Sequence, residues 1–218
     1  MTPAALLGLF RSEMADTVAP YFWSNVDVYS YIDDAQKMFC RLTDGIPDAY
    51  QPALTRIPVV PGTEWYTLSP LILKIRAVTF ALTGRAVEVF TPETATTYGV
   101  RFDGATGPTK AVVTGLRENA VRVWPVPNQA MDLELSVFRL PLTTINGTAL
   151  EAFEIAEHHH LHLLTWAKAR AYLKQDAECF DRARSAEFDQ MFRGYCHEVL
   201  REQSRKRRTT GTTVYGGL

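Results

Sequence analysis

The residues best suited to chemistry lie in one histidine-rich run, Glu157–His162, which reads EHHHLH. On a helix, His158 and His162 stand four residues apart and share a face, which is how paired imidazoles bind a metal ion. The run is not the metalloprotease HExxH pattern, because His159 follows His158 where that pattern has glutamate. No other Cys/His cluster supplies a third ligand at suitable spacing, since His197 stands alone. Two interpretations follow: a metal-dependent hydrolase site, or a helix start packed at an interface, which we favour.

No other arrangement in the chain is typical of catalysis. The sequence contains no GxSxG motif, no P-loop and no GxGxxG motif after a predicted strand. The acid pairs Asp33-Asp34 and Asp44/Asp48 have no partner base nearby, and we interpret them as solvated carboxylates. We therefore expect no enzymatic activity, no cofactor and no bound metal.

The charge of the chain is balanced in total but uneven along its length. The 218 residues include 23 Lys or Arg and 24 Asp or Glu. Residues 201–218 hold five basic and one acidic side chain, a net charge of +4, which leaves a net charge of −5 on residues 1–200. An acidic body with a cationic tail indicates that the tail binds an acidic surface, either protein or nucleic acid.

Targeting signals are not evident in the sequence. No apolar run approaches the roughly 20 residues that span a bilayer, so we expect no membrane association. The N-terminal residues lack a basic n-region, which argues against a signal peptide. The chain has three cysteines, Cys40, Cys179 and Cys196. An odd count without CxxC spacing favours a reducing intracellular compartment.

Helical patterns begin at the N-terminus. Thr2 and Pro3 predict the N-cap and first position of a short helix. Ser24–Asp27 resembles a capping box with Asp in place of Glu, and it predicts a second helix that ends near Gly45.

A longer helical pattern occupies the C-terminal part. Glu154–Arg205 contains no proline and one glycine, and its apolar residues recur at helical spacing. The polar patch Lys174–Asp176 predicts a break, with Asp176 capping the helix that follows. Thr148–Glu151 is a further capping-box pattern that returns the chain to helix. These features predict a helical hairpin.

Between the helical parts, short alternating runs separated by proline and glycine predict a small antiparallel β domain. Thr91–Ala95 predicts one helical turn within it. Strands are expected at Leu54–Val60, Glu64–Leu68, Ile72–Ala81, Ala86–Phe90, Lys110–Thr114, Ala120–Trp124 and Met131–Leu140.

The predicted fold class is α+β. Residues 1–46 and 148–204 form a helical bundle of two N-terminal helices and a long C-terminal hairpin. Residues 47–147 form the inserted β domain, and residues 205–218 form an extended C-terminal arm.

The arm combines basic residues, which steer it to a partner, with the β-prone segment Thr212–Tyr215, which is able to add a strand to an exposed edge. The alternatives are a solubilising end and a nucleic-acid arm, for which five basic residues and one aromatic are a weak signal. The residues expected to bind a partner are Arg205, Lys206, Arg207, Arg208, Thr212, Thr213, Val214, Tyr215 and Leu218.

Four groups of stretches share their order and spacing with a known family: Tyr21–Ser24 with Tyr31–Cys40, Pro61–Ser69 with Ile72–Val78, Val121–Pro127 with Leu133–Pro141, and His158–Leu161 with Ala169–Lys174 and Asp176–Glu178. Taken together, they resemble the head-to-tail adaptor (connector) proteins of tailed bacteriophages. Val28 and Asp33 depart from the family pattern, which more often has an acid and an asparagine there.

The resemblance implies a structural virion protein without enzymatic activity. Its copies would form a closed dodecameric ring in the neck, between the capsid portal and the tail, after synthesis in the bacterial cytoplasm. The arm would bind the portal protein, and the β domain would face the next tail component (nozzle, tail tube or stopper). Genomic DNA would pass through the channel without sequence-specific binding, and an acidic lumen would let it slide. The alternative is a nucleic-acid-binding protein that uses the basic tail.

Overall fold

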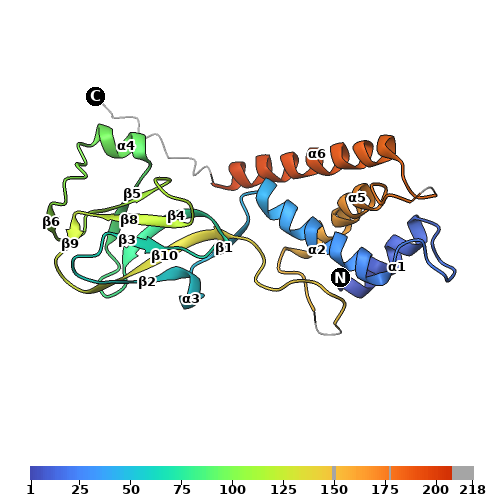
Figure 1. Ribbon diagram of the computed structural model, residues 1–218, viewed down its shortest axis with the longest axis horizontal. Helices are drawn as coiled ribbons and strands as arrows, with labels where there is room; N and C mark the ends of the chain where they lie inside the picture. The colour runs from blue at the N-terminus through green and yellow to red at the C-terminus, as the bar shows by residue number, and fades with distance from the viewer. Residues whose placement is uncertain (149–150, 177, 208–218) are drawn as a thin grey trace, which may run out of the picture. The chain divides into compact units, whose positions relative to one another are not determined.

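The computed structural model describes residues 1–148, 151–176 and 178–207. It is a mixed α/β structure with a curled β-sheet, and its chain divides into two units (Figure 1). Met1–Thr43 and Thr143–Leu218 form the first, here called the helical unit. Asp44–Leu142 form the second, here called the sheet unit.

In the helical unit, α5 packs against both α2 and α6, and α1 contacts α2 and α5. The largest fully buried side chains of this unit, Phe10, Phe192, Leu6, Ile32 and Leu163, come from four of these helices. The elements are α1 (Pro3–Glu13), α2 (Asn25–Leu42), the 3-10 turn η1 (Glu157–His159), α5 (His160–Ala171) and α6 (Arg182–Arg207).

Local hydrogen bonds begin the first two helices as predicted. The Thr2 side chain accepts a hydrogen bond from the backbone N–H of Ala5 at 3.2 Å, and Pro3 occupies the first helical position. At α2 the capping box is complete, because Ser24 and Asp27 each accept a hydrogen bond from the backbone N–H of the other. Both predicted helix starts are confirmed.

The predicted break in the C-terminal helical run lies at the right place, but its cap is wrong. Asp181, not Asp176, accepts the backbone N–H of Arg184 at 3.0 Å and begins α6. The backbone carbonyl of Asp176 instead accepts hydrogen bonds from the N–H groups of Cys179 and Phe180. Asp176 therefore forms a turn within the connection, and the helix begins five residues later than predicted.

The predicted helix start at Thr148–Glu151 is also wrong. The Glu151 carboxylate accepts hydrogen bonds from the backbone N–H groups of Asn146 and Gly147 and from the Thr148 hydroxyl. These bonds close a loop, and residues 151–156 are not helical. A capping-box pattern thus forms a turn here, because the acid bonds to the residues before it.

Two polar residues on α2 hold the loop that precedes α5. Asp33 is 7% exposed, and its carboxylate accepts hydrogen bonds from the Ile145 N–H at 2.9 Å and from Lys37 Nζ at 2.5 Å. The Gln36 side-chain oxygen accepts the N–H of Glu154 at 2.9 Å. The interpretation of Asp33 as a solvated carboxylate is therefore wrong, because the carboxylate is buried and binds a backbone N–H group. The same interpretation is wrong for Asp48, which is 7% exposed and binds Arg139.

Substitution of Gly147 tests how tightly this loop packs. Gly147 has φ +97°, and a Cβ there would lie 2.5 Å from Cε2 of Tyr29. We expect Gly147→Ala to lower the free energy of unfolding of the helical unit by about 1–3 kcal/mol, measured by urea denaturation. Gly84→Ala is the control, because Gly84 also has a positive φ but has no neighbour within 4 Å of the added Cβ. Equal losses in the two variants would contradict packing at Tyr29.

In the sheet unit every predicted strand is present within two residues of its expected ends, and the predicted helical turn is α4, with Thr91 as its N-cap. Three short strands, β1, β6 and β9, were not predicted. The elements are β1 (Ile46–Asp48), α3 (Pro52–Thr55), β2 (Arg56–Val59), β3 (Trp65–Thr67), β4 (Ile72–Phe80), β5 (Ala86–Phe90), α4 (Pro92–Thr97), β6 (Thr106–Gly107), β7 (Ala111–Thr114), β8 (Ala120–Trp124), β9 (Val126–Pro127) and β10 (Met131–Arg139).

The main sheet runs in the order β1-β10-β4-β5-β7-β8-β3, and β2 also pairs with β10. The prediction of an antiparallel sheet is wrong for one pair of strands. β5 pairs in parallel with β7, with Glu88 opposite Ala111. A parallel pair needs a crossover connection, which the segment containing α4 supplies. The core consists of Ile57, Val59, Val78, Val87, Val112, Val121, Val123, Leu133, Leu135 and Val137.

Candidate functional site

The histidine run begins α5, but not with the predicted geometry. His158 and His159 lie in the 3-10 turn η1, and α5 begins only at His160. His158 and His162 therefore do not share a face of one regular α-helix. Across residues 1–148, 151–176 and 178–207, no group of three or more His, Cys, Asp or Glu side chains is placed to hold a metal ion.

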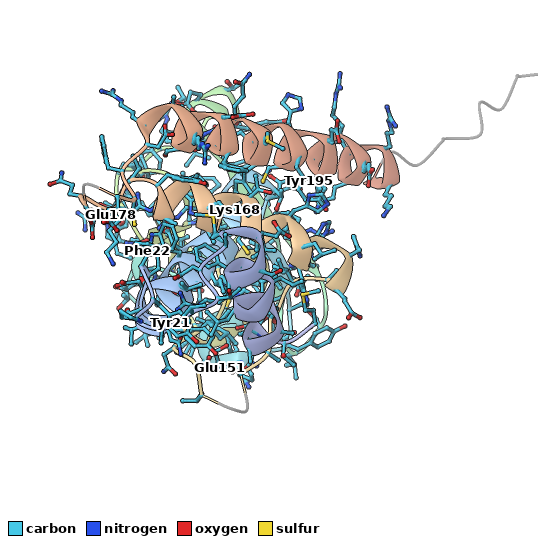
Figure 2. All side chains as sticks on the ribbon, turned by 90° about the vertical axis from the view of Figure 1, so that its right-hand side faces the viewer. Tyr21, Phe22, Glu151, Lys168, Glu178 and Tyr195 are labelled. Carbon is cyan, nitrogen blue, oxygen red and sulfur yellow. The ribbon has the colours of Figure 1, made fainter. Side chains whose placement is uncertain are left out.

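Tyr195 of α6 joins two of the histidines. Nδ1 of His159 and the Tyr195 hydroxyl share a hydrogen bond of 2.7 Å. The His162 ring stacks on the Tyr195 ring, with centroids 3.4 Å apart and planes 11° apart. On the α2 side, the His159 ring lies 4.7 Å from that of Phe39. Tyr195 is labelled in Figure 2, where it lies between the ribbons of α5 and α6. The sequence did not indicate these partners, because they lie more than 30 residues apart.

Burial decides the protonation states in this cluster. Burial is the largest cause that lowers the pKa of His159 to about 4, and the neighbouring His158 contributes to the same shift. Burial also raises the pKa of the Tyr195 phenol above its usual value. At neutral pH, His159 is neutral and Tyr195 protonated, so their hydrogen bond joins two uncharged groups. The pair stabilises the contact between the 3-10 turn η1 and α6.

His160 points into the protein and bonds to backbone. Its Nε2 lies 2.9 Å from the Ile155 carbonyl oxygen and must donate, because a carbonyl only accepts. Its Nδ1 is buried and has no hydrogen-bond partner within the described residues. The ring lies 4.5 Å from that of Phe153. His160 therefore anchors the turn that leads into α5, which is the packing role expected for this run.

The predicted arm divides between two parts of the chain. Arg205, Lys206 and Arg207 continue α6 and are not in an extended segment. Basic residues suit the last turn of a helix, where the dipole is negative. The remaining arm residues, Arg208, Thr212, Thr213, Val214, Tyr215 and Leu218, lie outside the described residues.

The α1–α2 connection exposes aromatic residues on the helical unit. Tyr21 is 45% exposed and Phe22 is 47% exposed, although Trp23 beside them is buried. Figure 2 shows Tyr21 and Phe22 on the same side of the unit as Glu178 of the α5–α6 connection. Lys174 joins the two connections, since its Nζ donates to the Phe22 carbonyl at 2.7 Å. We call the exposed apolar residues of these connections the aromatic loop patch: Val18, Tyr21, Phe22, Leu173 and Phe180.

A buried ion pair fixes the aromatic segment of this patch, Tyr21 and Phe22, in place. The Arg11 guanidinium binds the Asp16 carboxylate, and both side chains are buried. The same carboxylate accepts the backbone N–H groups of Phe22 and Trp23. Arg11 also lies 4.0 Å from the centre of the Tyr21 ring. The exposed aromatics are thus held in one arrangement, as a preorganised contact surface requires. Their signal in the sequence is the run of three aromatics after Pro20.

Within the described part of the chain, no helix is both long and apolar enough to cross a membrane.

Two comparisons with known proteins bear on function. A family model described as SU10 adaptor protein matches residues 1–215. A comparison with curated proteins finds no match. The family match covers both the helical unit and the sheet unit.

Proposed function

Since this chain belongs to the SU10 adaptor protein family, and is thus a phage structural adaptor and a virion component, we propose that it is a head-to-tail adaptor that joins the portal to the tail. The observation that carries the proposal is the family match over residues 1–215. A resemblance in motif order, from Tyr21 to Glu178, supports the same assignment.

The copies form a closed ring, as a dodecamer, through which genomic DNA leaves the capsid. Every contact in such a ring is heterologous, so each subunit needs two different complementary surfaces. The aromatic loop patch is a suitable candidate for one of them, because exposed aromatics dominate the energy of protein contacts. The helical bundle, with α5 and α6 as a hairpin, lines the channel. The net charge of −5 on residues 1–200 supports passage of DNA without adhesion.

The C-terminal arm attaches the ring to the portal protein. It leaves the end of α6, where Arg201, Arg205 and Lys206 are exposed. These cations steer the segment to an acidic surface, and Thr212–Tyr215 adds a strand to an edge of the partner. The sheet unit faces the next tail component.

Deletion of residues 208–218 tests the arm while leaving α6 whole. We expect the truncated protein to remain folded, with a free energy of unfolding within about 0.5 kcal/mol of the full chain. We also expect it to lose attachment to purified portals in negative-stain electron microscopy, where the full chain forms rings. The control replaces residues 208–218 with a glycine-serine segment of equal length, which should also fail to attach. Normal rings on portals with either variant would refute the portal-binding role of the arm.

A further inference from the structure

The main sheet contains a gap between β4 and β5. On one side, β4 pairs with β10 from Ile72 to Phe80. On the other side, it pairs with β5 only at Val78 and Thr79. From Glu88 onward β5 pairs with β7 instead. Within the described residues, the segment Ile72–Ala77 therefore has a strand neighbour on one side only.

A groove of about 500 Å³ lies along this free edge. Its walls are Ile72–Ile75 of β4, Val89–Thr91 at the end of β5, and residues at the ends of β7 and β8. Ile72, Ile75 and Val89 also pack against the hydrophobic core of the sheet unit. The groove thus opens directly onto the core, and a strand placed in it would complete the apolar packing.

A free strand edge presents backbone N–H and C=O groups to any extended chain, and proteins normally shield such edges. The usual devices are a proline, a bulge that turns the edge away, or a covering loop. The segment Ile72–Ala77 contains no proline, and two register shifts interrupt its pairing with β10, one at Arg76 and one at Leu73. The irregular pairing shields the edge only in part, because the apolar Leu73 is still 38% exposed. An added strand would pair its backbone with this edge and place alternate side chains in the groove.

The charges around the groove indicate the chemistry of the occupant. Among the described residues that line it, Lys74 and Arg117 are charged and none is acidic. The Arg117 guanidinium is held 4.0 Å from the centre of the Trp65 ring. A segment with carboxylates would match both cations, whereas a basic segment would be repelled. The basic residues 205–208 make this chain's own C-terminal part a poor match.

We propose that the groove between β4 and β5 binds an extended, acidic segment of a partner protein as an added β-strand. The partner's backbone pairs with Ile72–Ala77, its apolar side chains cover Ile72 and Ile75, and its carboxylates bind Lys74 and Arg117. The inference deepens the tail-facing role proposed for the sheet unit. It rests on that role only in identifying the partner as a virion protein of the tail.

The test uses the full chain and synthetic ten-residue peptides, with binding measured by fluorescence anisotropy. One peptide has valine at alternate positions with glutamate between them, and its matched partner has lysine in place of glutamate. We expect the glutamate peptide to bind and the lysine peptide to bind at least tenfold more weakly. We expect Lys74→Glu and Arg117→Glu each to weaken binding of the glutamate peptide at least fivefold. Arg85→Glu, an exposed charge reversal on the β4–β5 turn outside this groove, should change affinity less than twofold.

N-methylated peptides distinguish strand pairing from side-chain attraction. Methylation of every second backbone nitrogen blocks one edge of the peptide, and shifting it by one residue blocks the other edge. If the peptide binds as an added strand, methylation in one register should abolish binding, and the peptide methylated in the other register should still bind. Circular dichroism of each charge-reversal variant shows whether its fold is retained.

Three outcomes would overturn the proposal: equal binding of the two peptides, binding unaffected by the register of methylation, and binding only after residues 208–218 are deleted. The last would show that the chain's own C-terminal segment occupies the edge. Portal attachment of the arm deletion is measured separately from peptide binding. Failure of the groove proposal can therefore be told apart from failure of the proposed adaptor function.

Discussion

Replacing Asp48 with alanine is expected to lower the free energy of unfolding of the sheet unit by about 3–5 kcal/mol. Asp48 and Arg139 are both buried, and the Arg139 Nε donates to the Asp48 carboxylate at 2.6 Å. The other carboxylate oxygen accepts the backbone N–H groups of Tyr50 and Gln51. The substitution removes this carboxylate from a buried guanidinium and from two backbone donors, and each loss has a desolvation cost.

The ion pair of Arg56 and Asp132 provides the matched control for Asp48. It lies in the same unit with an N–O distance of 2.5 Å, but its side chains are 52% and 36% exposed. We expect Asp132→Ala to cost less than about 1 kcal/mol, because water replaces the lost partner. A second variant, Asp48→Ala with Arg139→Met, should recover part of the loss by removing the buried charge.

Hydrogen exchange with urea denaturation would assign the loss from Asp48→Ala to the sheet unit. Protection should fall on β1 and β10, which the Asp48–Arg139 pair joins, and remain unchanged on α5 and α6. Equal effects of Asp48→Ala and Asp132→Ala would contradict the argument, since the two pairs differ chiefly in burial.

Acidification from pH 6.5 to pH 4 is expected to lower the free energy of unfolding of the helical unit by about 3 kcal/mol. The pKa of His159 is about 4 in the folded chain, chiefly because burial disfavours the charged ring. An unfolded chain has an ordinary His pKa near 6.5. Between these values the unfolded state binds a proton that the folded state does not, so stability falls as pH falls. Burial also lowers the pKa of His162, which adds a loss of the same sign.

Acid should affect the two units over different pH ranges. In the sheet unit, burial would raise the pKa of Asp48, but hydrogen bonds from Tyr50 and Arg139 outweigh it and hold the pKa below the usual 3.8. The stability that Asp48 contributes is present above that value and is lost as pH falls below it. The helical unit should therefore weaken first, between pH 6.5 and 4.

Variants of two histidines separate this effect from general acid denaturation. His159→Asn should remove most of the pH dependence between pH 6.5 and 4, although it also lowers stability at neutral pH by disturbing the Tyr195 and Phe39 contacts. His197→Asn, at an exposed position of α6, should leave the pH dependence as it is. The measurement is urea denaturation at intervals of half a pH unit. A profile unchanged by His159→Asn would refute the assignment.

Local patterns in the sequence determined much of the secondary structure. Helix starts at Thr2 and Ser24 were predictable because a cap bonds to residues two or three positions away. Strands such as Met131–Arg139 were predictable because alternating side chains reveal a half-buried surface. The motif order from Tyr21 to Glu178 was sufficient to indicate the family, which the match over residues 1–215 shows.

Capping signals failed where the sequence offered a second cap or a second hydrogen-bond partner. Asp176 and Asp181 are both able to cap a helix, and the choice of Asp181 depends on its backbone N–H, which donates to the Tyr172 carbonyl at 3.0 Å. Glu151 had the capping-box spacing but bonds to Asn146 and Gly147. Spacing alone does not distinguish these pairings, because each satisfies the same acceptor.

Only the tertiary structure decided how distant residues share a site. The partners of His159 lie on α2 and α6, and the partner of Asp33 is the backbone of Ile145, 112 residues away. The gap between β4 and β5 likewise depends on β5 leaving its neighbour to pair with β7. Sequence periodicity reports which face of an element is buried, because that property is local. Which element covers that face depends on contacts between segments far apart in the chain, and no local pattern in the sequence specifies those contacts.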